Sequence, residues 1–372
     1  MTKEEYRLAA ETVLYLCACA LRQSVPCSER LSSVNWQQVF TVASDHSLAS
    51  QCAFALEAAS IHEPSFTKAK GRAIRKTAVM EMDKNALFQR MEEEKIWYAP
   101  LKGLVLKDFY PAYGMRQMAD FDILFDRSRA ETVRDILVEL GFTVGHFGKG
   151  NQDVYYKKPS SNFEMHTELF SPDKSRRIYD YFCHAEEKLL PDETGGYARH
   201  FRPEDFYLYV IAHAYRHYIG PGTGLRYIMD MAVLWKQYGE TMDRAYIHQE
   251  TEKIGITGFE QDLHRLSEAI LSEQPVPEEL KGMLLYMMDS GTYGKPENRV
   301  QNQLQASGKK RYLFRRLFPS VDEIKTYYPF FYRHKLLLPA LFFYRIGRAI
   351  TVGRQKTKKE WAQITQKTDR DP

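Results

Sequence analysis

Cysteine is scarce in this sequence of 372 residues, and the five cysteines show no metal-binding pattern. Four of them lie within the first 52 residues, and no pair has the CxxC spacing or the spacing of zinc ligands. The common zinc modules are therefore excluded. An odd number of crowded cysteines favours reduced thiols over a disulfide framework, so we expect a cytoplasmic protein.

Long apolar runs and a strong charge of one sign are also lacking. No stretch reaches the roughly 18 apolar residues of a membrane-spanning helix. The first residues, Thr2-Lys3-Glu4-Glu5, are acidic where a secretion signal has a basic segment followed by an apolar one. The 52 basic and 48 acidic residues give a net charge of +4, which is too mild for a dedicated nucleic-acid binder. These absences agree with a cytoplasmic, globular protein.

Helix-forming and strand-forming segments divide the chain unevenly. Most of the sequence has helical periodicity, whereas the middle of its first half holds short β-forming runs. We therefore predict an α+β fold in which a small mixed sheet is embedded in a mostly helical chain. The polar, glycine-containing stretch 291–308 predicts a mobile connection. The expected regions are an N-terminal helical region at 1–95, an α+β core at 96–172, a helical domain completing a cleft at 173–290, and a C-terminal helical segment with a basic tail at 291–372.

Apolar spacing and breaker residues locate the individual elements. The predicted strands are 96–101, 121–125, 153–157 and 162–169, with helices at 104–110 and 128–140 between them. The other predicted helices are 3–23, 36–47, 48–59, 64–95, 174–188, 203–219, 223–238, 244–253, 258–271, 309–317 and 336–351.

Two aspartates, Asp120 and Asp122, flank Phe121 at the start of a predicted strand. Residues two apart on a strand project from the same face, so both carboxylates point the same way. Like charges this close repel and raise a pKa unless a cation lies between them, and paired carboxylates suit Mg²⁺. Glu164 alternates with His166 and Glu168 on a later predicted strand and could supply a third carboxylate. The alternative is a solvated strand end.

The order of several motifs resembles a known family. Pro100-Leu101-Lys102-Gly103, Asp120-Phe121-Asp122 and Glu164-Met165-His166 resemble the poorly characterised nucleotidyltransferase-like family of the polymerase-β-type superfamily. Downstream, His213-Ala214-Tyr215-Arg216-His217 and the segment 225–230, Leu-Arg-Tyr-Ile-Met-Asp, are similar to its helical HxxxH and LRxxxD region. The resemblance extends over nearly the whole chain after about residue 75.

This resemblance implies an enzyme, a Mg²⁺-dependent nucleotidyltransferase. It would move a nucleoside monophosphate, AMP from ATP in our interpretation, to an acceptor hydroxyl. Asp120, Asp122 and Glu164 would be catalytic and would hold two Mg²⁺ ions that stabilise the attacking and leaving oxygens. Relatives usually have aspartate at the third position, so Glu168 is an alternative to Glu164. A second hypothesis is a module that kept the fold, lost turnover and holds a nucleotide or another partner.

The resemblance also indicates nucleotide contacts. Lys102 and Gly103 stand where most of the superfamily has Gly-Ser at a helix N-terminus, which can cradle a triphosphate. Lys102 could instead be a solvated lysine. Arg116 could clamp a phosphate with two hydrogen bonds or form a surface salt bridge. The residues expected to line the cleft from the helical side, touching nucleotide or acceptor, are His213, His217, Arg226 and Asp230.

Three further patterns have plainer interpretations. His213 and His217 have zinc-compatible helical spacing, but Ala214 stands where a metalloprotease needs Glu, and buried hydrogen-bonding histidines are favoured. His166 could brace Glu164. The glycine-rich segment 220–224 is followed by no Lys-Ser or Lys-Thr pair, so a P-loop is disfavoured.

The C-terminal segment is basic throughout. Between Thr326 and Lys359 there is no acidic residue, and aromatic and leucine side chains are interleaved with the basic ones. Such a segment could contact an anionic membrane surface or RNA. A packed C-terminal helix followed by a solvated tail is the favoured interpretation.

Overall fold

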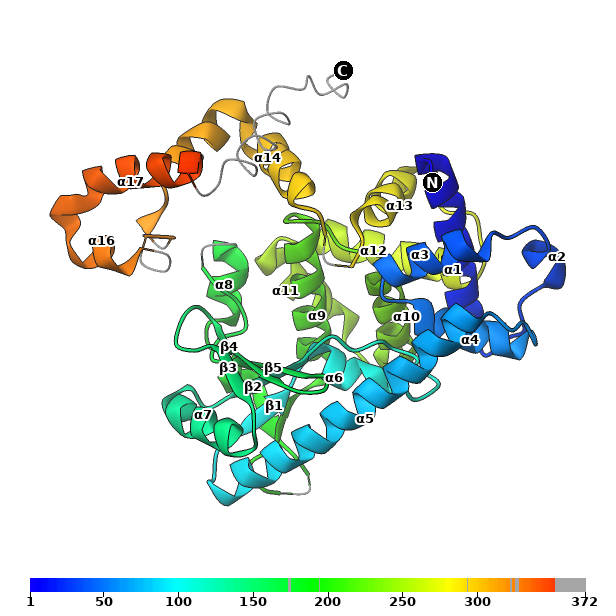
Figure 1. Cartoon of the computed structure of the whole chain (residues 1–372), viewed down its shortest axis with the longest axis horizontal. Helices are drawn as coiled ribbons and strands as arrows, with labels where there is room; N and C mark the ends of the chain where they lie inside the picture. The colour runs from blue at the N-terminus through cyan, green and yellow to red at the C-terminus, as the bar shows by residue number, and fades with distance from the viewer. Residues whose placement is uncertain (173–174, 194, 293, 322, 325–327, 352–372) are drawn as a thin grey trace.

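The computed structural model describes residues 1–172, 175–193, 195–292, 294–321, 323–324 and 328–351. Helices account for 63% of the structure and surround a five-stranded mixed sheet and a small two-stranded sheet (Figure 1). The predicted α+β class with a helical majority is therefore confirmed. Among the described residues, no helix combines the length and the apolar character needed to cross a bilayer.

The larger sheet has the strand order β1-β2-β5-β4-β3. Its strands β2 and β5 run parallel, and the other neighbouring pairs are antiparallel. The parallel register places Asp122 opposite Glu164, so two of the predicted carboxylates become direct neighbours. The strands are β1 (Tyr98–Pro100), β2 (Phe121–Phe125), β3 (Thr143–His146), β4 (Gln152–Lys157) and β5 (Ser161–His166).

Alternation along β2 and β5 gives this sheet one apolar and one polar face near the strand starts. Phe121, Ile123, Phe163 and Met165 are buried in a core that includes side chains of the helices beneath. Those helices are α5 (Pro64–Glu93) and α7 (Ala130–Glu139), and α5 runs the length of this layer (Figure 1). Because side chains alternate, the acidic residues of both strands project from the opposite face.

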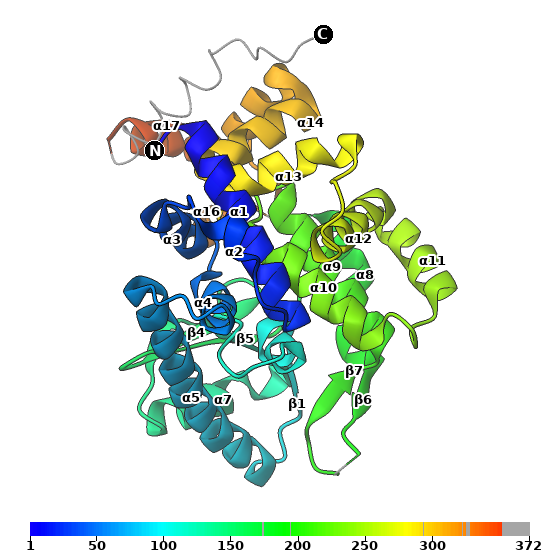
Figure 2. The same cartoon turned by 90° about the vertical axis from the view of Figure 1, so that its right-hand side faces the viewer.

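A second core joins the first helices of the chain to later ones. Helix α1 packs against α3, α4 and α12, so segments far apart in sequence lie side by side (Figure 2). The helices in and around this core are α1 (Lys3–Arg22), α2 (Ser28–Leu31), α3 (Trp36–Asp45), α4 (Ala49–Ala58), α8 (Arg176–Phe182), α9 (Pro203–Tyr218), α10 (Arg226–Tyr238), α11 (Arg244–Ile254), α12 (Thr257–Leu271) and α13 (Glu278–Ser290).

Two local predictions differ from the structure. A helix was expected over 174–188, but the α-helix there, α8, covers only Arg176–Phe182. A hairpin of β6 (Leu189–Pro191) and β7 (Arg199–Phe201) follows, which was not predicted. Its three-residue strands are too short for a periodicity signal. The stretch 291–308 lies largely in α14 (Pro296–Leu317), which starts with proline at its first turn, a position that proline favours. Gly308 kinks this helix with a φ of 73°.

The described C-terminal part forms an arm that extends from the body beyond α14 (Figure 1). It contains α16 (Pro329–Arg333) and α17 (Leu338–Thr351), which matches the predicted helix at 336–351. The sequence analysis favoured a C-terminal helix that packs on the protein, and this prediction is wrong. Leu341 is the one buried residue among the described side chains of 328–347. The basic residues after 351 lie outside the described residues.

Candidate functional site

Three acidic side chains gather where the start of β2 lies beside the second half of β5. Asp122 on β2 is buried, with 6% of its side chain exposed, and Glu164 stands opposite it on β5. Asp120, one residue before β2, is half-buried, and its charge interacts with that of Asp122. The strand register thus makes Asp122 and Glu164 direct neighbours, and the charge of Asp120 adds to theirs.

The charge of Asp122 is matched by two neighbouring groups. Lys102 donates from Nζ to Asp122 Oδ1 at 2.6 Å, and the side chain of Lys102 is 16% exposed. His166 Nε2 lies 2.8 Å from the same oxygen and 3.9 Å from Glu164 Oε2. Lys102 holds a φ of 41°, in the left-handed region that non-glycine residues rarely adopt and that is often found at functional sites. One carboxylate oxygen is thus shared by an ammonium and an imidazole.

The three carboxyl groups differ in acidity although they lie close together. Burial raises the pKa of Asp122, but the Lys102 charge and the His166 hydrogen bond outweigh it and hold that pKa below the usual range. Burial and the charges of both aspartates raise the pKa of Glu164 to about 7. Burial and the Asp122 charge also raise the pKa of Asp120. Near neutral pH, Asp122 is the ionised member, and the other two hold protons more readily until a cation arrives.

His166 acts as a neutral donor in this arrangement. Burial lowers its pKa, and the hydrogen bond to Asp122 only partly opposes that shift. A neutral imidazole has one N–H, so the 2.8 Å contact assigns that proton to Nε2. Nδ1 of His166 is buried without a hydrogen-bond partner among the described residues. The geometry agrees with a bracing role, although the braced carboxylate is Asp122 rather than Glu164.

Arg116 and Asp230 form a buried ion pair. Nε and Nη2 of Arg116 donate to the two carboxylate oxygens of Asp230 at 2.8 and 2.9 Å, and Tyr110 Oη donates to Oδ1 at 2.8 Å. The side chains of Arg116 and Asp230 are 7% and 3% exposed. The bidentate geometry expected for a phosphate is here made to a carboxylate of α10. This pair ties α10 to the loop that leads into Asp120.

The backbone of Gly103 packs against this ion pair and leaves no room for a side chain. A Cβ at Gly103 would collide with the guanidinium of Arg116 and would lie 3.0 Å from Cε of Met118. The helix that starts here, α6 (Lys102–Leu106), has five residues, and a 3₁₀ turn follows it. The helix N-terminus expected as a triphosphate cradle is therefore a single turn, and Lys102 at its start points to Asp122.

The helical side of the site is formed by α9 and the start of α10. His213 is buried, and its ring centre lies 4.6 Å from that of His217. Burial and the Lys102 charge hold the pKa of His213 well below its usual range. Arg226, the first residue of α10, interacts electrostatically with Asp120, and its Nε is buried without a partner among the described residues. The charge of Arg226 thus acts on Asp120, and His213 lies within electrostatic reach of Lys102 and His166.

Three residues near the carboxylate site were not predicted from the sequence. Tyr209 and Arg216 share the α9 face with His213 at spacings of four and three residues, a signal that helical periodicity could have supplied. Tyr209 Oη and Arg216 Nη1 are buried without partners in the described part of the chain. Lys76 of α5 donates from Nζ to the carbonyl of Ala119 at 2.8 Å and so fixes the residue before Asp120.

Two alternatives raised by the sequence are not supported by the structure. Glu168 pairs with Arg127 at 2.5 Å, beyond the end of β5, whereas Glu164 stays beside Asp122. His213 and His217 belong to no group of three metal-ligating side chains among the described residues. The structure therefore favours Glu164 over Glu168 as the third carboxylate, and it does not support a zinc site at His213 and His217.

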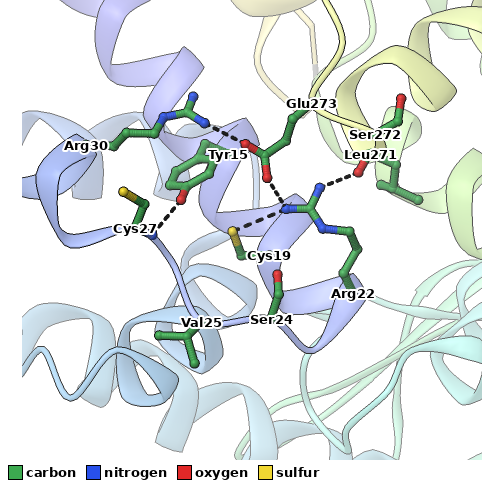
Figure 3. Close-up of a pocket in the computed structure, with 10 residues that line it drawn as sticks. All are labelled: Tyr15, Cys19, Arg22, Ser24, Val25, Cys27, Arg30, Leu271, Ser272 and Glu273. Carbon is green, nitrogen blue, oxygen red and sulfur yellow. Dashed lines mark hydrogen bonds and ion pairs between the residues drawn. The ribbon is translucent and has the colours of Figure 1, made fainter.

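A surface pocket of about 470 Å³ lies elsewhere, between α1 and the end of α12 (Figure 3). Arg22 and Arg30 both pair with Glu273, and the guanidinium of Arg30 lies 3.8 Å from the ring centre of Tyr15. The charged groups of this pocket are thus matched by one another. The pocket contains none of the residues predicted for the functional site.

The donor set at the carboxylates fits a divalent cation. One ligand atom from each of Asp122, Glu164 and His166 lies within 4.8 Å of the others. Carboxylate oxygens are the ligands that Mg²⁺ prefers, and Asp120 adds a carboxylate beside this group. Burial, and after it the charges of Asp122 and Asp120, raises the pKa of Glu164, and a bound cation would oppose this shift.

Comparison with known proteins gives one match. A family model described as an uncharacterised nucleotidyltransferase matches residues 32–272, about two thirds of the chain. The matched range includes both aspartates, Glu164 and the whole of α9 and α10. Comparisons with curated proteins and with solved structures found no match.

Proposed function

This chain belongs to the uncharacterised nucleotidyltransferase family, and we propose that it transfers AMP from ATP to a hydroxyl group of an acceptor. The observation that carries the proposal is the cluster of Asp120, Asp122 and Glu164 on and beside two neighbouring parallel strands. The choice of ATP rests on the family resemblance. We further propose that the cluster holds two Mg²⁺ ions, which when bound would stabilise charge on the attacking and leaving oxygens.

The proposed transfer exchanges one phosphorus–oxygen bond for another. The acceptor oxygen bonds to the α-phosphorus, the bond from that phosphorus to the bridging oxygen breaks, and pyrophosphate leaves. The hydroxyl proton passes to Glu164. Glu164 suits this role because it is the carboxylate that stands opposite Asp122 on the neighbouring strand. Asp122, kept ionised by its neighbours, is the permanent anion of the site.

The other predicted residues fall into two groups by their contacts. Lys102 and Arg226 act on the carboxylates through their charges, and His213 lies beside His217 within reach of the Lys102 charge. We assign these four residues to the triphosphate and the acceptor. We assign Arg116, Asp230 and Gly103 to positioning instead. The ion pair between Arg116 and Asp230 holds α10 against the loop that leads to Asp120, and Gly103 leaves room for the Arg116 guanidinium.

One observation favours the second candidate, a nucleotide-holding module without turnover. Lys102 already places a positive charge 2.6 Å from Asp122, where a metal-dependent enzyme needs a free carboxylate. In an active enzyme, Lys102 has to leave Asp122 or share it when the cation binds. In an inactive module, Lys102 would stay and replace the cation.

Transfer of a label separates these two functions. The protein is incubated with Mg²⁺, a cell extract as the source of acceptor, and ATP labelled at either the α- or the γ-phosphate. The enzyme hypothesis predicts a product that keeps the α-label, while the γ-label appears in pyrophosphate. Asp122→Asn abolishes this transfer, and Asp135→Asn, a change at an exposed aspartate of α7, leaves it intact. Binding of ATP without transfer of the α-label would favour the module.

A further inference from the structure

The C-terminal arm, defined here as residues 328–351, has an apolar surface that the described part of the protein leaves uncovered. Leu336 is 96% exposed, Phe343 is 72% exposed and Phe330 is 58% exposed. Leu336, Ala340 and Phe343 recur at intervals of four and three residues, so they share one side of the helical segment. Large apolar side chains gathered on one exposed face mark an interaction surface.

The opposite side of the arm is already occupied. Leu341 is buried, and Phe342 stacks on Phe318 from the end of α14 with ring centres 5.6 Å apart. Tyr344 contacts Tyr328, with ring centres 6.4 Å apart. The arm therefore has an inner face that packs on its own neighbours. Its outer face is formed by other residues, Leu336 in the 3₁₀ turn Lys335–Leu337 and Ala340 and Phe343 on α17.

The charge of the arm has one sign. It contains Arg333, Lys335, Arg345 and Arg348 and no aspartate or glutamate. Arg333 and Lys335 are exposed, and they immediately precede the exposed Leu336. Basic residues continue in the sequence after the arm, and the next acidic residue is Glu360. An apolar face beside basic residues is complementary to a surface that is anionic outside and apolar beneath.

We propose that the C-terminal arm docks on an anionic phospholipid membrane surface. The apolar face enters the boundary between headgroups and acyl chains, and the neighbouring basic residues contact lipid phosphates. The 14 residues of α17 are fewer than the roughly 20 needed to span a bilayer, so the helix lies along the surface. A membrane is favoured over RNA because a fully exposed leucine has no role in phosphate or base contact.

Vesicle flotation with the full chain tests this proposal. Wild-type protein is mixed with vesicles of phosphatidylcholine alone or of phosphatidylcholine with phosphatidylglycerol. It should float with the anionic vesicles, and binding should weaken as salt is added. Arg333→Gln/Lys335→Gln should reduce the partition coefficient by about 25-fold, at about fivefold per basic residue near the surface. Leu336→Ser/Phe343→Ser should reduce it by at least about tenfold.

A matched control changes exposed apolar residues elsewhere. Leu8→Ser/Met82→Ser alters side chains that are 67% and 73% exposed on α1 and α5, and it should leave vesicle binding unchanged. Circular dichroism and thermal melting verify that each variant is folded. Equal loss of binding in the control, or no binding of the wild type to anionic vesicles, would overturn the proposal.

Two other occupants are distinguished in the same series. Binding of the wild type to a single-stranded RNA but not to vesicles would overturn the membrane assignment in favour of RNA. A dimer detected by light scattering, dissociated by Leu336→Ser/Phe343→Ser and indifferent to vesicles, would overturn it in favour of a second copy. None of these outcomes depends on nucleotide transfer, because the arm shares no residue with the carboxylate site.

Discussion

Removing the charge of Lys102 should strengthen divalent cation binding at the carboxylates. In the structure, its ammonium occupies Asp122, so an incoming cation has to displace it or share the oxygen. Lys102→Met keeps most of the length of the side chain and removes the charge. Because the cation then meets an ionised aspartate with one competitor fewer, its affinity should rise.

The size of the effect follows from the contact. The two atoms are 2.6 Å apart, and the side chains of Lys102 and Asp122 are 16% and 6% exposed. Coulomb's law at an effective dielectric constant of about 20 gives an attraction of about 6 kcal/mol. Desolvation offsets much of this, and a charge-assisted hydrogen bond has a net value of about 1.5–3 kcal/mol. At 1.4 kcal/mol per factor of ten, the affinity should rise about 10- to 100-fold.

Titration with Mn²⁺, followed by the electron paramagnetic resonance of the free ion, measures this affinity without nucleotide. The titration should be carried out at mildly alkaline pH. Loss of Lys102 raises the pKa of Asp122, and at lower pH protons would compete with the metal for this carboxylate. Lys102→Arg keeps the charge and should bind Mn²⁺ weakly, like the wild type. Lys107→Met removes a lysine that pairs with Glu81 and Asp108 and should change nothing. Unchanged or weaker Mn²⁺ binding by Lys102→Met would refute the competition.

Four further predictions concern the same site. Cation affinity should rise with pH up to about 7, by about tenfold per unit at lower pH, because Glu164 must lose its proton, and Glu164→Gln should flatten the profile measured by calorimetry. The raised pKa also means that the metal-free protein loses up to about 3 kcal/mol of stability between about pH 4.5 and 7, and Glu164→Gln should remove this loss from urea titrations. Arg116→Met should lower the free energy of unfolding by about 3–5 kcal/mol because it leaves Asp230 buried and unpaired, and adding Asp230→Leu should restore most of it; a double variant as unstable as the single one would contradict this. Gly103→Ala should cost about 1–3 kcal/mol through its collision with Arg116, and a neutral effect in the same assay would show that the guanidinium can move aside.

Local sequence patterns were sufficient for the elements that carry the carboxylates. Period-two alternation located both strands and predicted that Glu164 and His166 share a face. It could not predict which strands are neighbours, because pairing is decided by contacts between distant segments. The parallel pairing of β2 with β5 brings Asp122 and Glu164 together from positions 42 residues apart.

The contacts of individual side chains were less predictable than their positions. A bidentate arginine looks the same in sequence whether its partner is a phosphate or an aspartate 114 residues away, so the partner of Arg116 required the structure. The same holds for Lys102, whose partner Asp122 is reached only when α6 meets β2. Short elements such as β6 and β7 were missed because three residues hold no readable period.

Calorimetric titration of ATP in the presence of Mg²⁺ tests the central claim most directly. The account predicts that the wild type binds ATP only with the metal, that Asp120→Asn/Asp122→Asn loses this binding, and that Asp135→Asn keeps it. Binding of ATP that needs neither the metal nor the two aspartates would contradict the proposed site.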